Sequence, residues 1–243
     1  MRSEPDLPSA TAKLLMAGNN TRLDAQSVQR LQAWRNLPSP ASRPLLDEAR
    51  FVIVDVETSG LNPNRDQLIA IGAVAVQGAR ISIQDSFEII LRQDNVSHKD
   101  NILVHGIGDA AQAGGTPPAE ALLCFLDYLR KDPLIAFHVT FDETAIRRAL
   151  RKFLKLNFKH DWLDLAYVMP ALYPDRAGEC RTLDDWMQCF GIRNVARHNA
   201  ISDAIATAEL MLIVFNKARQ SGIDRLSGLQ ELEKAQRWVS WAR

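Results

Sequence analysis

Residues 51–61 read FVIVDVETSGL, a short apolar run that ends in two acids and a turn. A run of this length, rich in β-branched residues, is typical of a buried strand. Asp55 and Glu57 lie two residues apart, so both carboxylates should face the same side of that strand. Ile53 should lie deeper on their side and Val54 on the other. Two such carboxylates repel each other unless a divalent cation neutralises them, and Mg²⁺ and Mn²⁺ prefer carboxylate oxygens. Taken alone, the pair of acids fits an exposed, solvated strand end about as well as it fits a metal site.

The elements on either side of the turn predict an α/β fold. Further strands are expected at 68–76, 80–91 and 134–138, the first two joined by a hairpin at Gln77-Gly78. Helices are expected at 117–130, 141–156, 182–190, 200–219 and 226–241, and a short strand or helix within 161–172. Strands come first as a meander and then alternate with helices. This order predicts a mixed sheet flanked by helices.

The first 48 residues differ from the rest of the chain. Leu23, Val28, Leu31 and Trp34 recur at near-helical spacing, and residues 14–16 suggest a shorter helix before them. Prolines at 38, 40 and 44 then mark a connection. The chain is therefore divided into three parts. They are a helical extension with a Pro-rich connection (1–48), a main domain (49–220) and a C-terminal helix packed on that domain (221–243). The extension could pack on the main domain or on a second subunit, and both alternatives stay open.

Composition limits the possible classes of protein. The 243 residues are 47% apolar, and 29 Lys and Arg balance 29 Asp and Glu. Zero net charge argues against a histone-like protein held to nucleic acid by bulk charge, but not against an enzyme that grips one strand end. The three cysteines, Cys124, Cys180 and Cys189, lack metal-ligand spacing. The start has no apolar segment of a signal peptide, and no apolar run reaches about 18 residues, so a soluble, cytoplasmic protein is expected.

Three further candidate site residues lie at the start of later helices or in the loop before one. Asp142 follows the fourth strand and lies in the first turn of the next helix, where the helix dipole alone stabilises an acid by about 0.3–1 kcal/mol. If that strand lies beside the first one, Asp142 comes close to Asp55, because ligands gather at the carboxyl ends of adjacent strands. His198 and Asp203 lie five residues apart, so they converge only if His198 is in the loop before the helix. A loop imidazole beside a metal-bound water is suited to act as a general base, although most loop histidines are surface residues.

Four segments now read together as one pattern: 54–61 (VDVETSGL), 105–107 (HGI), 136–142 (AFHVTFD) and 198–204 (HNAISDA). The pattern resembles the DEDDh exonuclease family, the DnaQ-like group with an RNase H-like fold. That group includes proofreading subunits such as DNA polymerase III epsilon, RNase T-like enzymes and oligoribonucleases. The resemblance covers about residues 51–215, and the His before the last Asp indicates the histidine branch. Val139 departs from the pattern, since many members have Asn after the His of the third segment.

The resemblance implies the fold and the site. The fold would be an RNase H-like, mixed five-stranded sheet. The metal-binding acids would be Asp55, Glu57, Asp142 and Asp203, with His198 as the general base. Thr58, Leu61, His105 and Ile107 match positions near the terminal nucleotide. Two Mg²⁺ or Mn²⁺ ions would be expected, one acidifying the attacking water and one steadying the leaving 3′ oxygen. Asp55 is the best candidate to bridge both ions.

Three functions compete at this stage. The first is a metal-dependent 3′→5′ exonuclease that releases nucleoside monophosphates from single-stranded nucleic acid, with DNA favoured as the substrate and oligoribonuclease or RNase T-like RNA trimming as the alternative. The second is an inactive relative that binds nucleic acid or scaffolds a partner, but all four acids and the His are present. The third is an RNase H-like endonuclease, which the HNAISDA segment disfavours. A polymerase or homodimer contact through residues 1–48 is a further possibility. The basic run after Asp142 (Arg147, Arg148, Arg151 and Lys152) fits a solvated helix face, with one or two members steering the strand.

Overall fold

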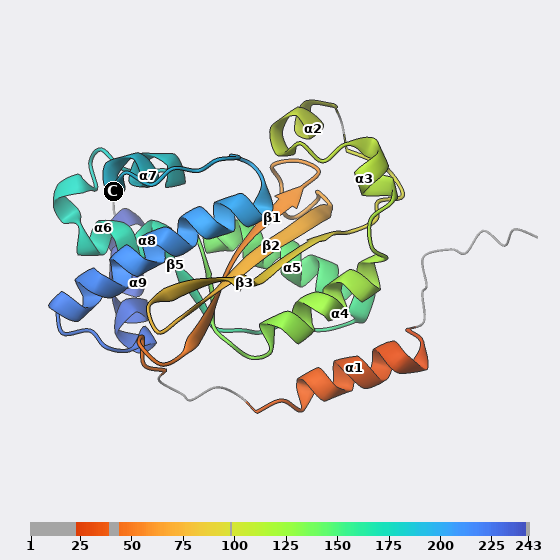
Figure 1. Ribbon diagram of the computed structural model, residues 1–243, viewed down its shortest axis with the longest axis horizontal. Coiled ribbons are helices and arrows are strands. Elements are labelled where there is room, and N and C mark those ends of the chain that lie inside the picture. Colours follow the sequence, from red (N-terminus) through yellow and green to blue (C-terminus); the bar gives the residue numbers. More distant parts are fainter. Residues whose placement is uncertain (1–22, 39–43, 98, 242–243) are drawn as a thin grey trace, which may run out of the picture.

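A five-stranded sheet forms the centre of the protein. The computed structural model describes residues 23–38, 44–97 and 99–241. The strands, in chain order, are β1 (Arg50–Thr58), β2 (Leu68–Gln77), β3 (Arg80–Ile90), β4 (Leu134–Ala136) and β5 (Trp162–Asp164). The helices are α1 (Ala25–Arg35), α2 (Lys99–His105), α3 (Asp109–Ala113), α4 (Pro118–Leu129), α5 (Val139–Leu154), α6 (Leu165–Leu172), α7 (Leu183–Phe190), α8 (Ala200–Gln220) and α9 (Leu226–Trp241), and a 3₁₀ turn, η1, covers Pro174–Arg176 (Figure 1).

The sheet is mixed, as the sequence predicts. Its strand order is β3-β2-β1-β4-β5. β1 pairs antiparallel with β2, which pairs antiparallel with β3, whereas β1, β4 and β5 run parallel. The β2–β3 turn has Gly78 at φ 58° and Ala79 at φ 52°, the two positive values that a tight hairpin needs. Because β4 pairs with β1, the helix that follows β4 begins beside the end of β1.

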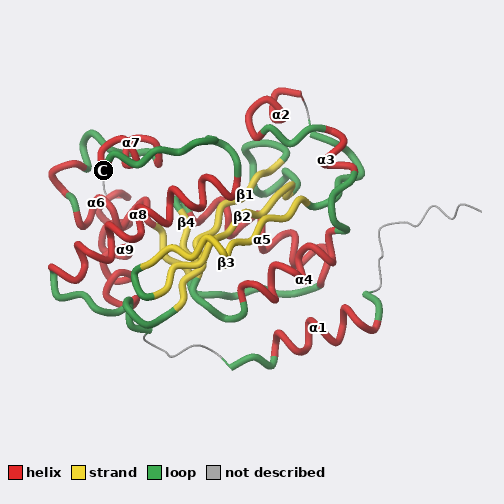
Figure 2. Tube along the Cα trace, viewed as in Figure 1, coloured by secondary structure: helices red, strands yellow, loops and turns green. Residues whose placement is uncertain are grey.

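Helices cover both faces of the sheet (Figure 2). The side chains of β1 point alternately to one face and the other. Val52 and Val54 belong to the core shared with α4 and α5. Phe51 and Ile53 belong to the second core, which α6, α8 and α9 close. This confirms that Ile53 lies on the side of Asp55 and Glu57, since side chains two apart on a strand share a face. The first two acids therefore point toward α8.

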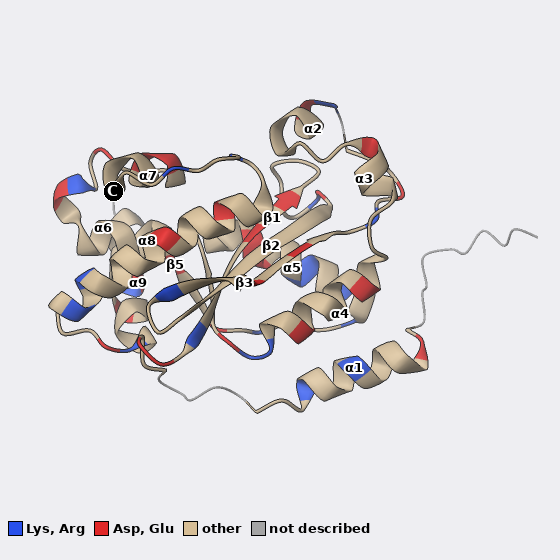
Figure 3. Ribbon diagram, in the orientation of Figure 1, with Lys and Arg blue, Asp and Glu red and all other residues tan. Residues whose placement is uncertain are grey.

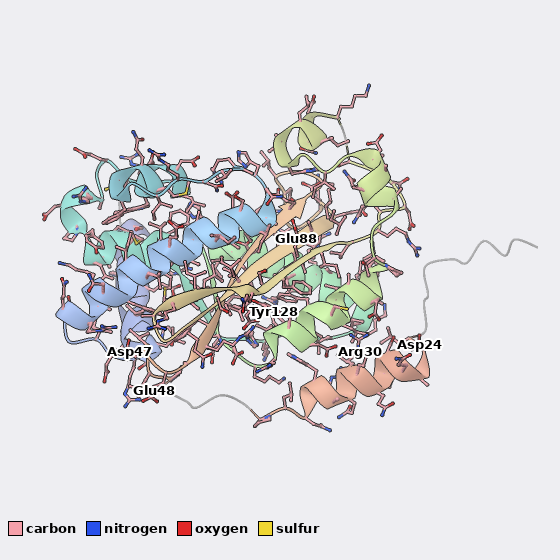
Figure 4. All side chains as sticks on the ribbon, in the orientation of Figure 1. Asp24, Arg30, Asp47, Glu48, Glu88 and Tyr128 are labelled. Carbon is pink, nitrogen blue, oxygen red and sulfur yellow. The ribbon has the colours of Figure 1, made fainter. Side chains whose placement is uncertain are left out.

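The N-terminal helix α1 packs on α4 of its own chain. Leu31 and Trp34 are buried, and the Trp34 indole donates a hydrogen bond to the Arg130 carbonyl at 2.7 Å. Arg30, which Figure 4 labels between α1 and α4, pairs with Glu120 at 2.7 Å and with Asp127 at 2.6 Å. The apolar face of α1 is thus used within the chain. The shorter helix expected around 14–16 lies outside the described residues.

Most predicted elements form within two or three residues of their expected bounds. The segment 161–172, which fitted either a strand or a helix, contains both β5 and α6. Two short helices, α2 and α3, were not predicted; they lie between β3 and α4 and rise beside the carboxyl end of β1 (Figure 1). Among the described helices, none is long and apolar enough to cross a membrane.

Candidate active site

Three predicted acids meet at the carboxyl end of β1. Asp55 and Glu57 come from that strand, where Asp55 pairs with Gly72 of β2. Asp203 comes from the first turn of α8 and is 4% exposed. One carboxylate oxygen from each of the three lies within 4.8 Å of the other two. Figure 3 shows the acidic segment at the end of β1. The structure thus brings together side chains that are nearly 150 residues apart in sequence.

Helix α8 is placed by its own first turn. The Asn199 side chain caps the helix by accepting a hydrogen bond from the Ser202 amide at 3.1 Å. Alanines at 200, 204, 206 and 208 are all buried and keep the first turns of α8 slim. The start of the helix lies directly against Gly72, so Asp203 arrives next to the strand that carries Asp55.

Asp142 approaches the cluster from the other side of β1. It lies in the first turn of α5 and is 4% exposed. Asp142 is not a member of the group of three carboxylates, but its charge raises the pKa of Asp55. Asp142 is therefore a neighbour of the cluster, positioned by the parallel pairing of β4 with β1.

The electrostatics of the site favour a bound cation. Burial raises the pKa of Asp55 well above its usual value, and repulsion from Asp142, Glu57 and Asp203 adds to it. Burial, together with the charge of Asp203, raises the pKa of Glu57 to about 8. Burial also raises the pKa of Asp142 well above normal, with Asp164 and Glu57 contributing. Partly buried carboxylates that repel one another in this way are stabilised by a divalent ion.

The loop between α7 and α8 surrounds the Asp203 carboxylate with two hydrogen-bond donors and a positive charge. Asp203 Oδ1 accepts a hydrogen bond from the Asn194 side chain and forms an ion pair with Arg197 Nη1 at 2.5 Å. Asp203 Oδ2 accepts from the His198 backbone amide at 3.0 Å. Asn194 also accepts from the Ser202 hydroxyl at 2.6 Å, which closes the loop onto α8. Asp203 thus orders the loop that carries His198.

His198 lies in this loop, as the sequence predicts, and its side chain is exposed. Its backbone has φ 60°, a left-handed conformation that is uncommon for a residue with a side chain. The hydrogen bond from its amide to Asp203 holds this conformation. His198 therefore stands at the rim of the acid cluster, with its ring free to meet solvent or substrate.

The four residues expected near a terminal nucleotide have different surroundings. Leu61 is 93% exposed and follows the acids of β1 directly. Thr58 is buried, and its hydroxyl donates to the Gly60 carbonyl at 2.5 Å. His105 is also buried, and its Nδ1 accepts from the Ile107 amide at 3.0 Å. The His105 ring is thus engaged inside the α2–α3 segment, and burial lowers its pKa. Leu61 is the member of the four that projects farthest into solvent.

The basic run after Asp142 does not act as one unit. Arg148 donates to the carbonyls of Asp66, at 2.9 Å, and Arg65, at 3.1 Å. It therefore clamps the loop that follows β1. Arg147 pairs with Glu143 one turn away on the helix surface. The solvated-face interpretation holds for Arg147, whereas Arg148 has a structural role.

Sequence reasoning missed three residues around the site. Asp164, at the end of β5, is 1% exposed and accepts hydrogen bonds from the His138 amide at 3.0 Å and from Arg237 of α9 at 2.9 Å. Its position at a strand end is the same signal that identified Asp55. Asn194 and Arg197 contact Asp203 directly. Their signal is weaker, because loop residues have no periodicity that predicts their contacts.

Comparison with known proteins agrees with this geometry. The family model for exonucleases (RNase_T) matches residues 52–211, which include all four acids and His198. The PolC-type DNA polymerase III of Thermotoga maritima is 27% identical over 199 residues, 80% of this chain and 14% of that protein. An epsilon-like protein of DNA polymerase III from Rhodobacter capsulatus is 29% identical over 73% of this chain and 25% of its own length. The chain thus spans a quarter or less of these relatives.

Solved structures show the same fold. Exonuclease I of E. coli in complex with a dT13 oligonucleotide superposes with a TM-score of 0.59 at 18% sequence identity, over 71% of this chain and 42% of that one. The strand order, the paired acids on β1 and the family match agree with one another. The chain therefore belongs to the exonuclease family of DnaQ-like proteins with an RNase H-like fold.

Proposed function

We propose that this protein is a metal-dependent 3′→5′ exonuclease that removes nucleoside monophosphates from single-stranded DNA. One observation carries the proposal: Asp55, Glu57 and Asp203 place carboxylate oxygens within 4.8 Å of one another, beside Asp142, and the exposed His198 is joined to Asp203 through its backbone amide. The names of the polymerase and exonuclease relatives favour DNA over RNA.

The donor set fits a hard divalent cation. All members of the cluster are carboxylates, which suit Mg²⁺ or Mn²⁺ rather than a softer metal. Asp55, Glu57 and Asp203 would hold the ions, and Asp142 would complete or support their shell. When bound, two ions would acidify the attacking water and stabilise the leaving oxygen.

The protein's own side chains would supply orientation and proton transfer. Asp55 belongs to the group of three carboxylates and also repels Asp142, so it is our candidate to bridge both ions. His198 would accept the proton of the attacking water, because its side chain is exposed and its backbone is held next to the acids by the hydrogen bond from its amide to Asp203.

Exposed apolar side chains surround this end of the sheet. Leu61 follows the acids of β1, and Val195, in the loop that leads to Asp203, is 97% exposed. Leu103 of α2 is 84% exposed, and the Asn101 side chain ties α2 to the Ser59 carbonyl next to the site. Apolar contacts with bases tolerate any sequence but require unpaired bases. This supports a single-stranded end as the substrate.

The test is digestion of end-labelled strands of several lengths, in DNA and RNA, with Mg²⁺, Mn²⁺ or EDTA. We expect mononucleotides from the 3′ end of DNA with either metal and none with EDTA. A 3′-phosphate should block the reaction. Cutting of a closed circular single strand would make the protein an endonuclease, and faster loss of short RNA would make it an RNA-trimming enzyme. Inactivity of a folded, metal-loaded protein on every strand would favour a binding role.

A further inference from the structure

Arg197 joins the acid cluster to helix α7. Its Nη1 atom lies 2.5 Å from Asp203 Oδ1, and its Nε atom lies 2.5 Å from Asp184 Oδ1. Its Nη2 atom also donates to Asp184 Oδ2 at 3.1 Å. The Arg197 guanidinium therefore forms ion pairs with both Asp184 and Asp203, and its Nη2 atom supplies the hydrogen bond to Asp184, whereas its buried Nε atom makes none with the described residues. Figure 1 shows the loop running from α7 to the carboxyl end of β1, where α8 begins.

The two contacts of Arg197 differ in their surroundings. The Asp203 side chain is 6% exposed, whereas the Asp184 side chain is 57% exposed. The charge of Arg197 also reaches beyond Asp203, since it opposes the raised pKa values of Asp55 and Glu57. Arg197 thus places a positive charge where four carboxylates otherwise repel one another. A guanidinium keeps this charge at every working pH.

A divalent ion and Arg197 require the same carboxylate. An ionised carboxylate has about four lone-pair positions, and Arg197, Asn194 and the His198 amide already take three on Asp203. An added divalent cation is also repelled by the guanidinium. The ion pair with Asp184 and its hydrogen bond from Nη2 do not involve the cluster, so they can persist when the contact with Asp203 is given up.

We propose that Arg197 is an exchangeable counter-cation of the acid cluster: it competes with the divalent metal ion for Asp203, and its hold on Asp184 keeps the His198 loop in place when the ion binds. This rests on the proposed metal site. Arg197 is a positioning residue in this scheme, because it acts through Asp203 and the loop. The balance between the two cations sets how tightly the site binds metal.

The test is Mn²⁺ titration of the full chain by calorimetry, with thermal unfolding in EDTA and in saturating Mn²⁺. Arg197→Gln should bind Mn²⁺ roughly threefold to tenfold more tightly, because the competing charge is gone. Its unfolding temperature should fall in EDTA and recover in Mn²⁺. Arg197→Lys, which keeps the charge, should bind Mn²⁺ like the wild type. Arg193→Gln removes a positive charge from an exposed position of the same loop and serves as the matched control.

The outcomes separate the possible roles. If Arg197→Gln binds Mn²⁺ no more tightly than the wild type, and loses equal stability with and without the ion, Arg197 is only an anchor and the inference is wrong. If Arg193→Gln gains as much affinity as Arg197→Gln, the effect is general charge and not competition at Asp203. If the wild type binds no Mn²⁺, the proposed function itself fails.

Discussion

Gly72 lies opposite Asp55 in the β1–β2 pair and in direct contact with the start of α8. A Cβ atom at Gly72 would lie 2.2 Å from the backbone nitrogen of Ile201 and 2.3 Å from the carbonyl carbon of Ala200. Both neighbours are backbone atoms, so neither can rotate away. The absence of a side chain at Gly72 therefore sets the distance between Asp203 and Asp55.

Gly72→Ala should push α8 away from β2. We expect a loss of about 1–3 kcal/mol in the free energy of unfolding, the usual cost of overpacking, together with weaker Mn²⁺ binding because Asp203 moves with the helix. Denaturant unfolding and metal titration measure the two effects. Gly178→Ala is the control, since a Cβ there meets nothing within 4 Å. Unchanged metal affinity in Gly72→Ala would show that Asp203 reaches the cluster without this contact.

The sequence was sufficient to predict the sheet and its acids. Period-two alternation in β1 placed Ile53 on the side of Asp55 and Glu57, and strand ends marked Asp142 correctly beside β1. These inferences work because burial and strand geometry act locally. The contact between Gly72 and α8 could not be predicted in this way, because it joins residues about 130 positions apart.

The loop residues were harder to predict for a different reason. Arg197 and Asn194 have no periodic pattern, and their contacts with Asp203 depend on how the loop closes. Helices α2 and α3 were missed because they are short and are held by a buried polar residue. The Gln112 side chain, 0% exposed, donates to the Ser97 hydroxyl and to the Ile107 carbonyl, both at 2.8 Å. Such hydrogen bonds stabilise a turn without leaving an apolar stripe.

Asp55→Asn and Asp203→Asn should both reduce hydrolysis to background in Mg²⁺, yet they should differ in stability. Asp55 is buried among repulsive acidic neighbours, so Asp55→Asn should stabilise the protein in EDTA at pH 8, because it removes a charge that burial and repulsion disfavour. Asp203→Asn removes the ion-pair partner of Arg197, so this variant should not be more stable than the wild type. Activity assays and unfolding in EDTA test both points. Full activity of either variant would remove that acid from the site.

Stability without metal should fall as pH rises. The pKa of Glu57 is raised from 4.5 to about 8 in the folded protein, so the folded state binds this proton more tightly than the unfolded chain does. The free energy of unfolding in EDTA should therefore decrease between about pH 5 and pH 8. Mn²⁺ should reverse the loss, and Glu57→Gln should make the profile less steep, while the raised pKa values of Asp55 and Asp142 preserve part of the slope. Thermal unfolding across this range is the measurement; a flat profile for the wild type would contradict the raised pKa.

The extension should be dispensable for chemistry but not for stability. Trp34→Ala should cost about 3–5 kcal/mol, since Trp34 is buried on α4 and stacks on Phe158. Metal affinity should stay unchanged, because α1 lies away from the acids (Figure 1). A shortened chain should begin at Pro44, inside the 1–48 extension, because the Pro44 carbonyl accepts a hydrogen bond from the Leu226 amide at 3.1 Å. Loss of metal binding in this folded, shortened protein would place part of the site in the extension.

His198→Ala should reduce kcat by roughly 10²–10⁴, the usual contribution of a positioned base, and should leave Mn²⁺ affinity almost unchanged. The reason is geometric: the His198 amide, not its ring, bonds to Asp203, so truncating the side chain keeps that hydrogen bond. Because His198 has φ 60°, His198→Asn is the better matched variant, as Asn tolerates this conformation.

If the neutral imidazole is the base, kcat of the wild type should rise with pH and the dependence should disappear in both variants. Measuring kcat against pH, with metal titrations on each protein, separates three roles. An unchanged kcat removes His198 from the mechanism, a large loss of Mn²⁺ affinity makes its ring a ligand, and a loss of activity in proportion to unfolding makes it structural.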